Sequence, residues 1–487
     1  MKASFFRSAE AFSATGDYRL LPFRFMRWPD DEVFVSNDVG EWHFLPATTF
    51  KQFASGQLQP QAVAFADLKA KHFLTDGSSS LPVQLLATKY RTKKSFLDGF
   101  TTLHMFVVTL RCDHCCPYCQ VSRVTEDRTR YDMTRETAIR AVEFMFRSPS
   151  PELKVEFQGG ESLLHFDAIR WIVEATNERN VSEQREIEFV IATNLSQLTE
   201  EVLDYCAQHS IQLSTSLDGP AFLHNANRPR PGQDSHERVV ASLARARARL
   251  GHDRVSALMT TTMESLRYPI EIVDEYVALG FNALFLRSIS PYGFAVRTKQ
   301  AFRYETDAFL DFYKAALTQI VDWNRKGTAI VEVFAQILLK KMLTPFPTGY
   351  VDLQSPAGAG LAAVVYNYDG DVYASDEGRM LAEMQDKSFR LGNLHTDRYE
   401  SVMGGARMRA IVEQSCNETL PGCSECAFLP FCGADPVGNW ATQGDLVGHR
   451  PTSAFCRKNM GVIRHLLGLL RGGDDFTRRL LTSWAVH

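Results

Sequence analysis

Residues 103–119 read LHMFVVTLRCDHCCPYC and join a short apolar run to a group of four cysteines. The run 103–110 is rich in β-branched and aromatic residues, so it predicts a buried strand. Cys112, Cys116 and Cys119 follow it with the spacing C-x3-C-x2-C, which predicts a loop that wraps a metal centre at the end of that strand. Thiolates grouped this tightly favour metal over a disulfide framework.

Three thiolates on one loop suit a [4Fe–4S] cubane in which the fourth iron has no protein ligand. Two alternatives use the same stretch. A zinc site would need four ligands and would recruit His114 or Cys115, whereas Cys116 with Cys119 matches a thioredoxin-like pair. The three-cysteine spacing after a strand is more specific than either, and we interpret Cys115 as a loop cysteine near the cluster.

The chain beyond this loop repeats a strand and then a helix. Thr134 is expected to cap the first of these helices. A series of such β/α units predicts an α/β fold with a parallel sheet, a partial (β/α)6 TIM-type barrel whose active site lies at the carboxyl ends of the strands. The further strands are expected at residues 154–158, 186–193, 212–217, 255–261 and 283–288.

Length and composition restrict the remaining possibilities. A chain of 487 residues predicts two or three domains. The formal net charge of -4 gives no electrostatic reason to expect nucleic acid or an anionic membrane as partner. No apolar run approaches the roughly 18 to 20 residues that a membrane helix needs, and no signal peptide is evident. We therefore expect a soluble cytoplasmic protein.

Four regions are predicted along the chain. Alternating apolar residues around a turn at 38–40, followed by two short amphipathic stretches, indicate a small α+β module of winged-helix-like outline, with a linker at 76–82. A DG turn at Asp369 and Gly370 indicates a later hairpin. The expected regions are the N-terminal module 1–82, the barrel core 98–325, a cysteine-bearing subdomain 345–460 and a C-terminal helix 461–487.

A second cysteine group lies in GCSECAFLPFC and just beyond it. Cys423, Cys426 and Cys432 have the spacing C-x2-C-x5-C, and Cys456 follows. Four thiolates with no histidine nearby suit either structural zinc or a second iron–sulfur cluster. The cysteines alone leave both possibilities open.

Polar residues follow the predicted strands of the core. The second strand ends in FQGGES, residues 157–162, where two glycines would let the backbone approach a ligand closely. Glu161 adds a carboxylate that would hold an ammonium group. The third strand ends in Thr193 and Asn194, and the fourth ends in STSLDGP with Ser216 at the rim.

With these motifs, residues 100–300 resemble the radical S-adenosylmethionine (SAM) superfamily. In that family SAM chelates the open iron through its amino and carboxylate groups, and its reductive cleavage releases a 5'-deoxyadenosyl radical. The resemblance implies a [4Fe–4S] cluster on Cys112, Cys116 and Cys119. It also implies the following SAM-binding residues: Tyr118, Gln158, Gly159, Gly160, Glu161, Thr193, Asn194, Ser216 and Arg228. Arg230 and Arg238 are alternatives to Arg228.

Downstream of such a core, the second cysteine group resembles the SPASM domain, which carries two auxiliary clusters in its full form. Three cysteine positions of the full motif are empty here: SPAGAG precedes the hairpin, VYASDE follows it, and Pro436 stands in the last place. The resemblance therefore implies one auxiliary [4Fe–4S] cluster on Cys423, Cys426, Cys432 and Cys456. Asp376 matches an aspartate that removes a substrate proton in sulfatase-maturing relatives, and the alternative is a solvated acid beside Glu377.

SPASM-type enzymes mostly act on ribosomally made peptides or on proteins. The stretches RCDHCCPYCQVSR, KYRTKKSF and YNYDGDVYASDE resemble the B-type radical SAM maturase of the His-Xaa-Ser peptide system. The resemblance implies an oxidoreductase that cross-links or otherwise oxidises a precursor peptide, whose leader the N-terminal module would capture as an added strand. It also implies a reductase, flavodoxin or ferredoxin as electron donor and a second maturase. The alternatives are formylglycine formation and a non-enzymatic, cluster-bearing peptide-binding or electron-transfer partner.

Overall fold

The computed structural model describes residues 18–76, 80–121, 123–124, 127–299 and 304–486, and its centre is an eight-stranded sheet. The strand order is β10-β9-β8-β7-β6-β13-β14-β15, and the pairs from β10 to β6 are all parallel. The predicted α/β core with a parallel sheet is confirmed. Its first five strands are β6 (Leu103–Thr109), β7 (Glu152–Gly159), β8 (Glu186–Thr193), β9 (Gln212–Ser216) and β10 (Val255–Leu258).

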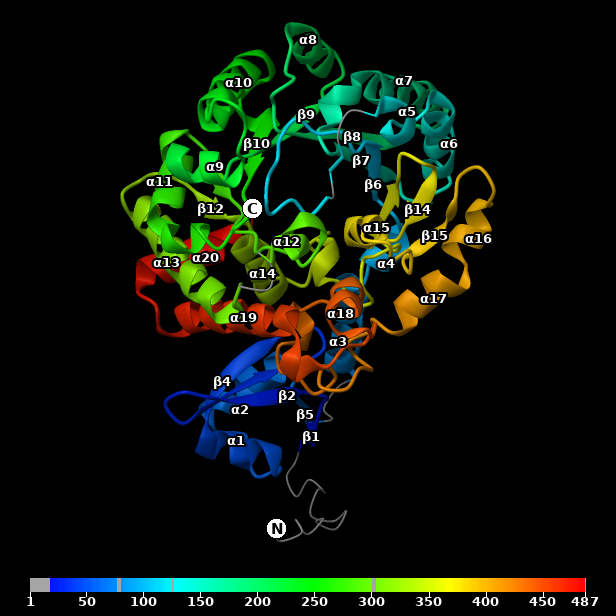
Figure 1. Ribbon diagram of the computed structural model, residues 1–487. Helices are drawn as coiled ribbons and strands as arrows, with labels where there is room; N and C mark the ends of the chain where they lie inside the picture. The colour runs from blue at the N-terminus through cyan, green and yellow to red at the C-terminus, as the bar shows by residue number, and fades with distance from the viewer. Residues whose placement is uncertain (1–17, 77–79, 122, 125–126, 300–303, 487) are drawn as a thin grey trace.

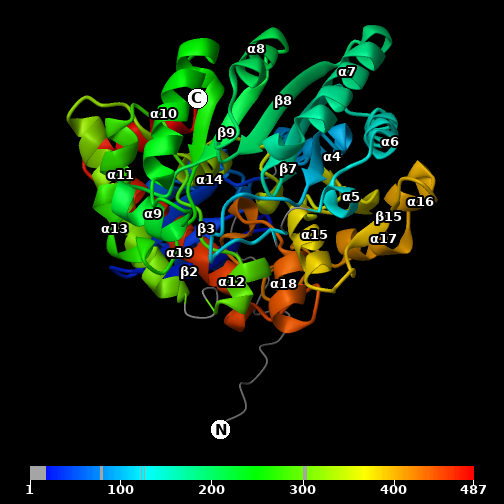
Figure 2. The same ribbon diagram turned by 45° about the horizontal axis from the view of Figure 1, so that its top comes forward.

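The two faces of this sheet differ in polarity. On β7, Val155 and Phe157 are buried and belong to the main core, while Glu156 and Gln158 point to the opposite face. Helices pack on the apolar face, and Figures 1 and 2 show them along the outer side of the curved sheet. These helices are α6 (Arg135–Met145), α7 (Phe166–Glu183), α8 (Glu200–Gln208), α9 (Ala221–Asn227), α10 (Ser235–Leu250) and α11 (Pro269–Ala278).

The sixth expected strand contributes little to the barrel. Only β11 (Ala283–Leu284) is a strand, and it pairs with β12 (Val331–Glu332) in a separate two-stranded sheet. A single bridge from Ser288 to Thr261 connects this segment to the end of β10. The barrel is therefore partial, and residues 285–292 run along a cavity instead of continuing the sheet.

The sheet continues on the other side of β6 with strands from the cysteine-bearing region. β13 (Ala363–Tyr366) pairs in parallel with β6, and β14 (Asp371–Tyr373) forms with it the hairpin expected at Asp369 and Gly370. β15 (Arg390–Asn393) completes the edge. Figure 1 shows β14 and β15 in yellow beside the blue β6. The subdomain expected from residue 345 thus shares one sheet with the core.

The N-terminal module has its own small core beneath the barrel (Figure 1). The expected hairpin is formed by β3 (Glu32–Ser36) and β4 (Trp42–Pro46), and two helices follow, α1 (Ala47–Ala54) and α2 (Val63–Ala70). A further strand, β2 (Arg24–Trp28), pairs with β3 and was not expected. Residues 1–17 of the module and 77–79 of the expected linker lie outside the described residues.

Four helices complete the body of the protein: α13 (Thr306–Arg325), α14 (Val333–Leu343), α19 (Ala454–Gly472) and α20 (Asp475–Trp484). Because α19 begins at Ala454, Cys456 lies in its first turn, and the boundary expected at residue 461 falls inside this helix. Among the described residues, no helix combines the length and apolar character needed to cross a membrane. The shorter helices are α3 (Leu81–Lys93), α4 (Phe96–Gly99), α5 (Arg128–Tyr131), α12 (Gly293–Arg297), α15 (Asp376–Glu383), α16 (Tyr399–Met403), α17 (Ala406–Glu413) and α18 (Pro436–Gln443).

Candidate functional site

The first cysteine group forms a loop at the carboxyl end of β6. Cys112, Cys116 and Cys119 are partly buried, whereas Cys115 is exposed, as expected for a spare thiol. Burial raises the pKa of the Cys116 thiol to about 12, and coordination by a metal would deprotonate it. Helix α12 fixes the end of the loop, because the carbonyl oxygen of Cys119 accepts a hydrogen bond of 2.7 Å from the backbone N–H of Phe294.

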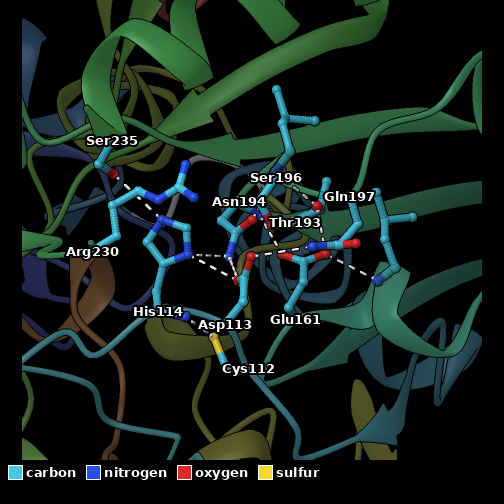
Figure 3. A network of polar contacts seen from close by, with 12 residues as sticks. Cys112, Asp113, His114, Glu161, Thr193, Asn194, Ser196, Gln197, Arg230 and Ser235 are labelled. Carbon is cyan, nitrogen blue, oxygen red and sulfur yellow. Dashed lines mark hydrogen bonds and ion pairs between the residues drawn. The ribbon is translucent and has the colours of Figure 1, made fainter. Parts of the chain in front are cut away.

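His114 does not support the zinc alternative. Its Nδ1 lies 2.9 Å from Oδ1 of Asp113 and 2.9 Å from Nδ2 of Asn194, and its Nε2 lies 3.4 Å from the hydroxyl of Ser235 (Figure 3). Both ring nitrogens therefore have partners within the protein. Hydrogen bonds from His114, Ser196 and Asn194 lower the pKa of Asp113 although its burial opposes this. Asp113 was not identified from the sequence as a site residue, and its position inside the cysteine loop was the only feature that pointed to it.

Glu161 connects the ends of β7 and β8. It is 1% exposed, and its carboxylate accepts hydrogen bonds from Leu163 N (3.0 Å), Thr193 Oγ1 (2.7 Å) and Asn194 N (2.7 Å). Burial raises its pKa to about 7 despite these three bonds. A carboxylate has about four acceptor sites, so one remains for the ammonium group that the sequence predicts.

The two glycines before it let two strands approach each other closely. A Cβ at Gly159 would collide with the carbonyl oxygen of Thr109, and a Cβ at Gly160 would collide with those of Leu110 and Arg111. The backbone of β7 therefore runs directly against the end of β6. The approach of the same backbone to a ligand stays a prediction of the sequence.

Tyr118, Asp218 and Arg228 form a buried group beside the cysteine loop. The Tyr118 hydroxyl donates to Asp218 Oδ2 (2.6 Å), and Arg228 Nε donates to the same oxygen (3.0 Å). The Arg228 guanidinium lies 5.5 Å from the centre of the Tyr118 ring. Arg228 therefore lies near the first cluster loop, whereas its rivals Arg230 and Arg238 pair with Asp234.

The remaining predicted SAM contacts lie on the polar face of the sheet. Gln158 donates a 2.8 Å hydrogen bond to Glu156, two residues before it on β7. Ser216 is the last residue of β9, opposite Leu258 of β10. Together with Thr193 and Asn194, these side chains come from the ends of three neighbouring strands, as expected for a site at the carboxyl edge of a parallel sheet.

The second cysteine group lines one large cavity. Cys423, Cys426, Cys432 and Cys456 all contribute to its wall, and its volume is about 490 Å³. Phe25 and Met26 of β2 form part of the same wall, so the N-terminal module reaches this site. Four thiols on a mostly apolar cavity match the donor set of an iron–sulfur cluster. Within the described residues, no three His, Cys, Asp or Glu side chains are grouped to hold a single metal ion.

Asp376 begins α15 and is not a freely solvated acid. Its Oδ1 accepts hydrogen bonds from Arg379 Nε (3.2 Å) and Nη2 (2.7 Å), and Arg379 is fully buried. Arg379 Nη1 also donates to the carbonyl oxygen of Val121, just after the first cysteine loop. The neighbouring Glu377 lines a separate cavity.

Comparisons with known sequences agree with this geometry. A family profile described as "Radical SAM superfamily" matches residues 106–276. An uncharacterized protein of Methanocaldococcus jannaschii is 26% identical over 196 residues, which are 40% of this chain and 65% of the relative. An uncharacterized protein of Methanothermobacter thermautotrophicus is 27% identical over 234 residues, 46% of this chain and 85% of the relative. The radical SAM cyclopropyl synthase TigE of Paramaledivibacter caminithermalis is 25% identical over 150 residues, 28% of this chain and 31% of the relative.

Two solved structures share the fold. anSMEcpe with bound AdoMet and a Kp18Cys peptide has a TM-score of 0.63 at 16% identity, covering 79% of this chain and 100% of that protein. Streptococcus suis SuiB bound to its precursor peptide SuiA has a TM-score of 0.53 at 14% identity, covering 89% of this chain and 98% of SuiB. The chain therefore carries a radical SAM domain at residues 106–276, and this domain implies SAM and a [4Fe–4S] cluster as its cofactors.

Proposed function

We propose that this enzyme abstracts hydrogen from a side chain of a ribosomally synthesised precursor peptide and leaves an oxidative cross-link or a related modification. The observation that carries the proposal is the presence of two separate cysteine sites in one chain, three cysteines on a strand-end loop and four around a cavity. The likeness to SuiB bound to a precursor peptide and to anSMEcpe bound to a peptide supports a peptide substrate.

In this proposal the first site binds the radical-generating cluster through Cys112, Cys116 and Cys119. With SAM and the reduced cluster bound, the site supplies a 5'-deoxyadenosyl radical. Glu161 offers its remaining acceptor position to the amino group of SAM, and the strand ends hold the rest of the molecule. The proposed SAM contacts are those of the sequence prediction: Tyr118, Gln158, Gly159, Gly160, Glu161, Thr193, Asn194, Ser216 and Arg228.

The second site is proposed to bind one auxiliary [4Fe–4S] cluster through Cys423, Cys426, Cys432 and Cys456. Its cavity is lined by all four thiols and by apolar side chains such as Phe25, Phe428 and Ile463. Such a cluster would accept an electron from the oxidised peptide or hold the peptide in place. The first role requires an external electron carrier, a flavodoxin, ferredoxin or reductase, and a reducing compartment such as the cytoplasm suits both sets of thiols.

The N-terminal module is proposed to bind the leader of the peptide. Its sheet has the order β2-β3-β4, so in the described part of the chain β2 and β4 are its edge strands. An edge strand offers unpaired backbone N–H and C=O groups to an extended peptide. On β2, the leader would lie next to the auxiliary cysteines, because Phe25 and Met26 line their cavity. A second maturase acting on the same peptide is part of this proposal.

Asp376 is the proton acceptor that the sequence predicts, and its bond to Arg379 holds it beside the first cysteine loop. Its position at the start of α15 supports a role near the reacting carbon. The ion pair with Arg379, however, occupies one of its oxygens.

The experiment that tests the function uses the full chain reconstituted anaerobically with iron and sulfide. It is incubated with dithionite, SAM and synthetic peptides encoded by the small reading frames next to its gene. The proposal expects 5'-deoxyadenosine and a peptide lighter by two hydrogens, with no aldehyde detectable by a hydrazide reagent. A hydrazide-reactive peptide would identify formylglycine formation instead, and a peptide of unchanged mass would refute peptide oxidation.

A further inference from the structure

A second cavity lies between the radical SAM domain and the auxiliary region. It has a volume of about 120 Å³ and is walled on one side by residues 285–292, which follow β11. Glu377 of α15 lies on its wall, and Asp435, Lys458 and Asn459 contribute from the auxiliary region. None of the residues predicted from the sequence as site residues lines this cavity.

The two sides of the cavity approach the two cysteine sites. Ile289, next to the wall residues Ser288 and Ser290, packs against Tyr118 and Cys116 of the first loop. On the other side, Asn459 Nδ2 lies 3.7 Å from Cys432 Sγ of the auxiliary group. A ligand in the cavity would therefore lie between the two proposed clusters.

Several polar groups of the cavity lack partners. Asn459 is 1% exposed, and its Oδ1 is a buried acceptor without a hydrogen bond. Within the described residues, neither the Arg287 guanidinium nor the Glu377 carboxylate has a side-chain hydrogen bond, although their opposite charges interact across the cavity. Lys458 Nζ donates a 3.2 Å hydrogen bond to the Ser288 hydroxyl and lies 5.7 Å from the ring centre of Phe455 and 5.9 Å from that of Phe334. Buried polar atoms without partners are rare in native proteins, so Asn459 Oδ1 offers an acceptor to a ligand group or a water in the cavity.

The charges of these groups restrict what the ligand is. The wall carries two cations, Arg287 and Lys458, and two acids, Glu377 and Asp435, so a neutral ligand group leaves this balance of charge undisturbed. An uncharged group that both donates and accepts hydrogen bonds satisfies Asn459 Oδ1 and the two cations together. A hydroxyl or an amide has this property.

We propose that this cavity receives a hydroxyl or amide group of the peptide and that Glu377 accepts its proton as the peptide is oxidised. This inference rests on the proposed function and assigns the proton acceptor within it. The hydrogen atom leaves the carbon with 5'-deoxyadenosine, the O–H or N–H proton passes to Glu377, and one electron goes to an iron–sulfur acceptor. The heteroatom then bonds to the oxidised carbon, so that two hydrogens and two electrons are lost.

The surroundings of Glu377 suit this role. Burial and, to a smaller extent, the charges of Asp352 and Asp376 raise its pKa to about 7, and Arg287 opposes this rise. A carboxylate with a pKa near the working pH is an effective base. Asp376 differs because one of its oxygens already accepts two hydrogen bonds from Arg379. Asp435 and Lys458 face the same cavity from the auxiliary region.

The catalytic test compares Glu377→Gln with Asp376→Asn, and Glu383→Gln near the far end of the same helix is the matched control. E377Q should still form 5'-deoxyadenosine but modify the peptide about 100-fold more slowly, while E383Q behaves like the parent. The rate of the parent enzyme should rise with pH and level off above about 7, and E377Q should lose this dependence. Unimpaired modification by E377Q, with loss in D376N, would overturn the inference.

A binding test decides the ligand class without the natural peptide. Ligand-observed NMR on the full chain compares neutral N-acetylserinamide, anionic N-acetylaspartate and cationic N-acetyl-lysinamide. Only the serine derivative should bind, and Glu377→Leu should weaken it about tenfold. Equal binding of the three probes, or binding that is indifferent to Glu377, refutes the cavity assignment. If SAM is cleaved but no peptide is modified, the proposed function fails while this test still decides about the cavity.

Discussion

The two cysteine groups of this protein are held by different kinds of structure. Cys112, Cys116 and Cys119 lie within eight residues on a loop between a parallel strand and its neighbours, and a polar network from several strand ends surrounds them. The second group lines an apolar cavity, and turns, the start of α19 and the N-terminal module form its wall. The strands of the sheet position the first site, whereas the second forms only when segments that are distant in the sequence pack together.

The second site depends on contacts between residues that lie far apart in the sequence. The hydroxyl of Ser36 donates a 2.6 Å hydrogen bond to the carbonyl oxygen of Ala427, across 391 residues. The rings of Phe34 and Phe428 pack in a tilted arrangement at the same contact, with their centres 5.7 Å apart. The auxiliary site should therefore be sensitive to changes in the N-terminal module that leave the first site intact.

The largest effect is expected at the first group. Replacing Cys112, Cys116 and Cys119 by alanine removes every predicted protein ligand of the cluster, so SAM cleavage should fall by about three orders of magnitude or more. Chromatographic assay of 5'-deoxyadenosine measures this loss. Cys115→Ala is the matched control and should retain full activity because its thiol is exposed. A triple variant that still cleaves SAM would show that the two groups have been assigned the wrong way round.

Removing the second group should separate the two functions. Cys423→Ala with Cys426→Ala should lower the iron content from about eight to about four atoms per chain. SAM cleavage should continue, but the peptide should remain unmodified. Iron and sulfide analysis and peptide mass spectrometry measure the two outcomes. Retention of about eight irons would contradict the assignment of a cluster to this cavity.

A smaller effect is expected from the buried ion pair beside the first loop. Arg228→Met leaves the Asp218 carboxylate buried without its cation, and its side chain is 0% exposed. Loss of one partner of a buried pair costs about 3–5 kcal/mol, measurable by urea unfolding. Arg230→Met is the control, because its more exposed 3.5 Å pair with Asp234 should contribute about 1 kcal/mol or less. Equal losses in both variants would mean that burial does not distinguish the two pairs.

The smallest change tests the contact between the module and the second site. Ser36→Ala removes the hydrogen bond to Ala427 and should lower the free energy of unfolding by about 1 kcal/mol. A chelator should then extract iron from the auxiliary site faster, with no change at the first site. Ser55→Ala, whose bond to Lys51 is exposed, serves as the control. Faster loss from both sites would show that they are not held independently.

Local features of the fold were predictable from the sequence. Thr134 accepts the hydrogen bond from Thr137 N that its place before α6 predicts, and Gly370 takes the positive φ of 84° that the DG turn requires. The cysteine loop follows its strand as expected. In each case the residues that determine the structure are neighbours in the chain.

Contacts between distant residues were not predictable in this way. β13 pairs with β6 although their residues lie about 260 positions apart in the sequence. Neither strand has a sequence feature that identifies the other as its partner. Asp376 forms an ion pair with Arg379, which the sequence did not indicate. The cavity beside Glu377 is formed by segments from three regions of the chain. The sequence indicated which residues belong to the site, but it did not indicate which side chains they contact.

The pairing of β13 with β6 also limits how this enzyme can be divided. If residues 98–325 were expressed alone, β6 would become an edge strand in the middle of a hydrophobic layer, and such an edge recruits other chains into aggregates. Exchanging the auxiliary region between relatives would require the incoming segment to supply a strand that fits beside β6. A chimera joined at residue 345 therefore has to restore a strand that pairs with β6.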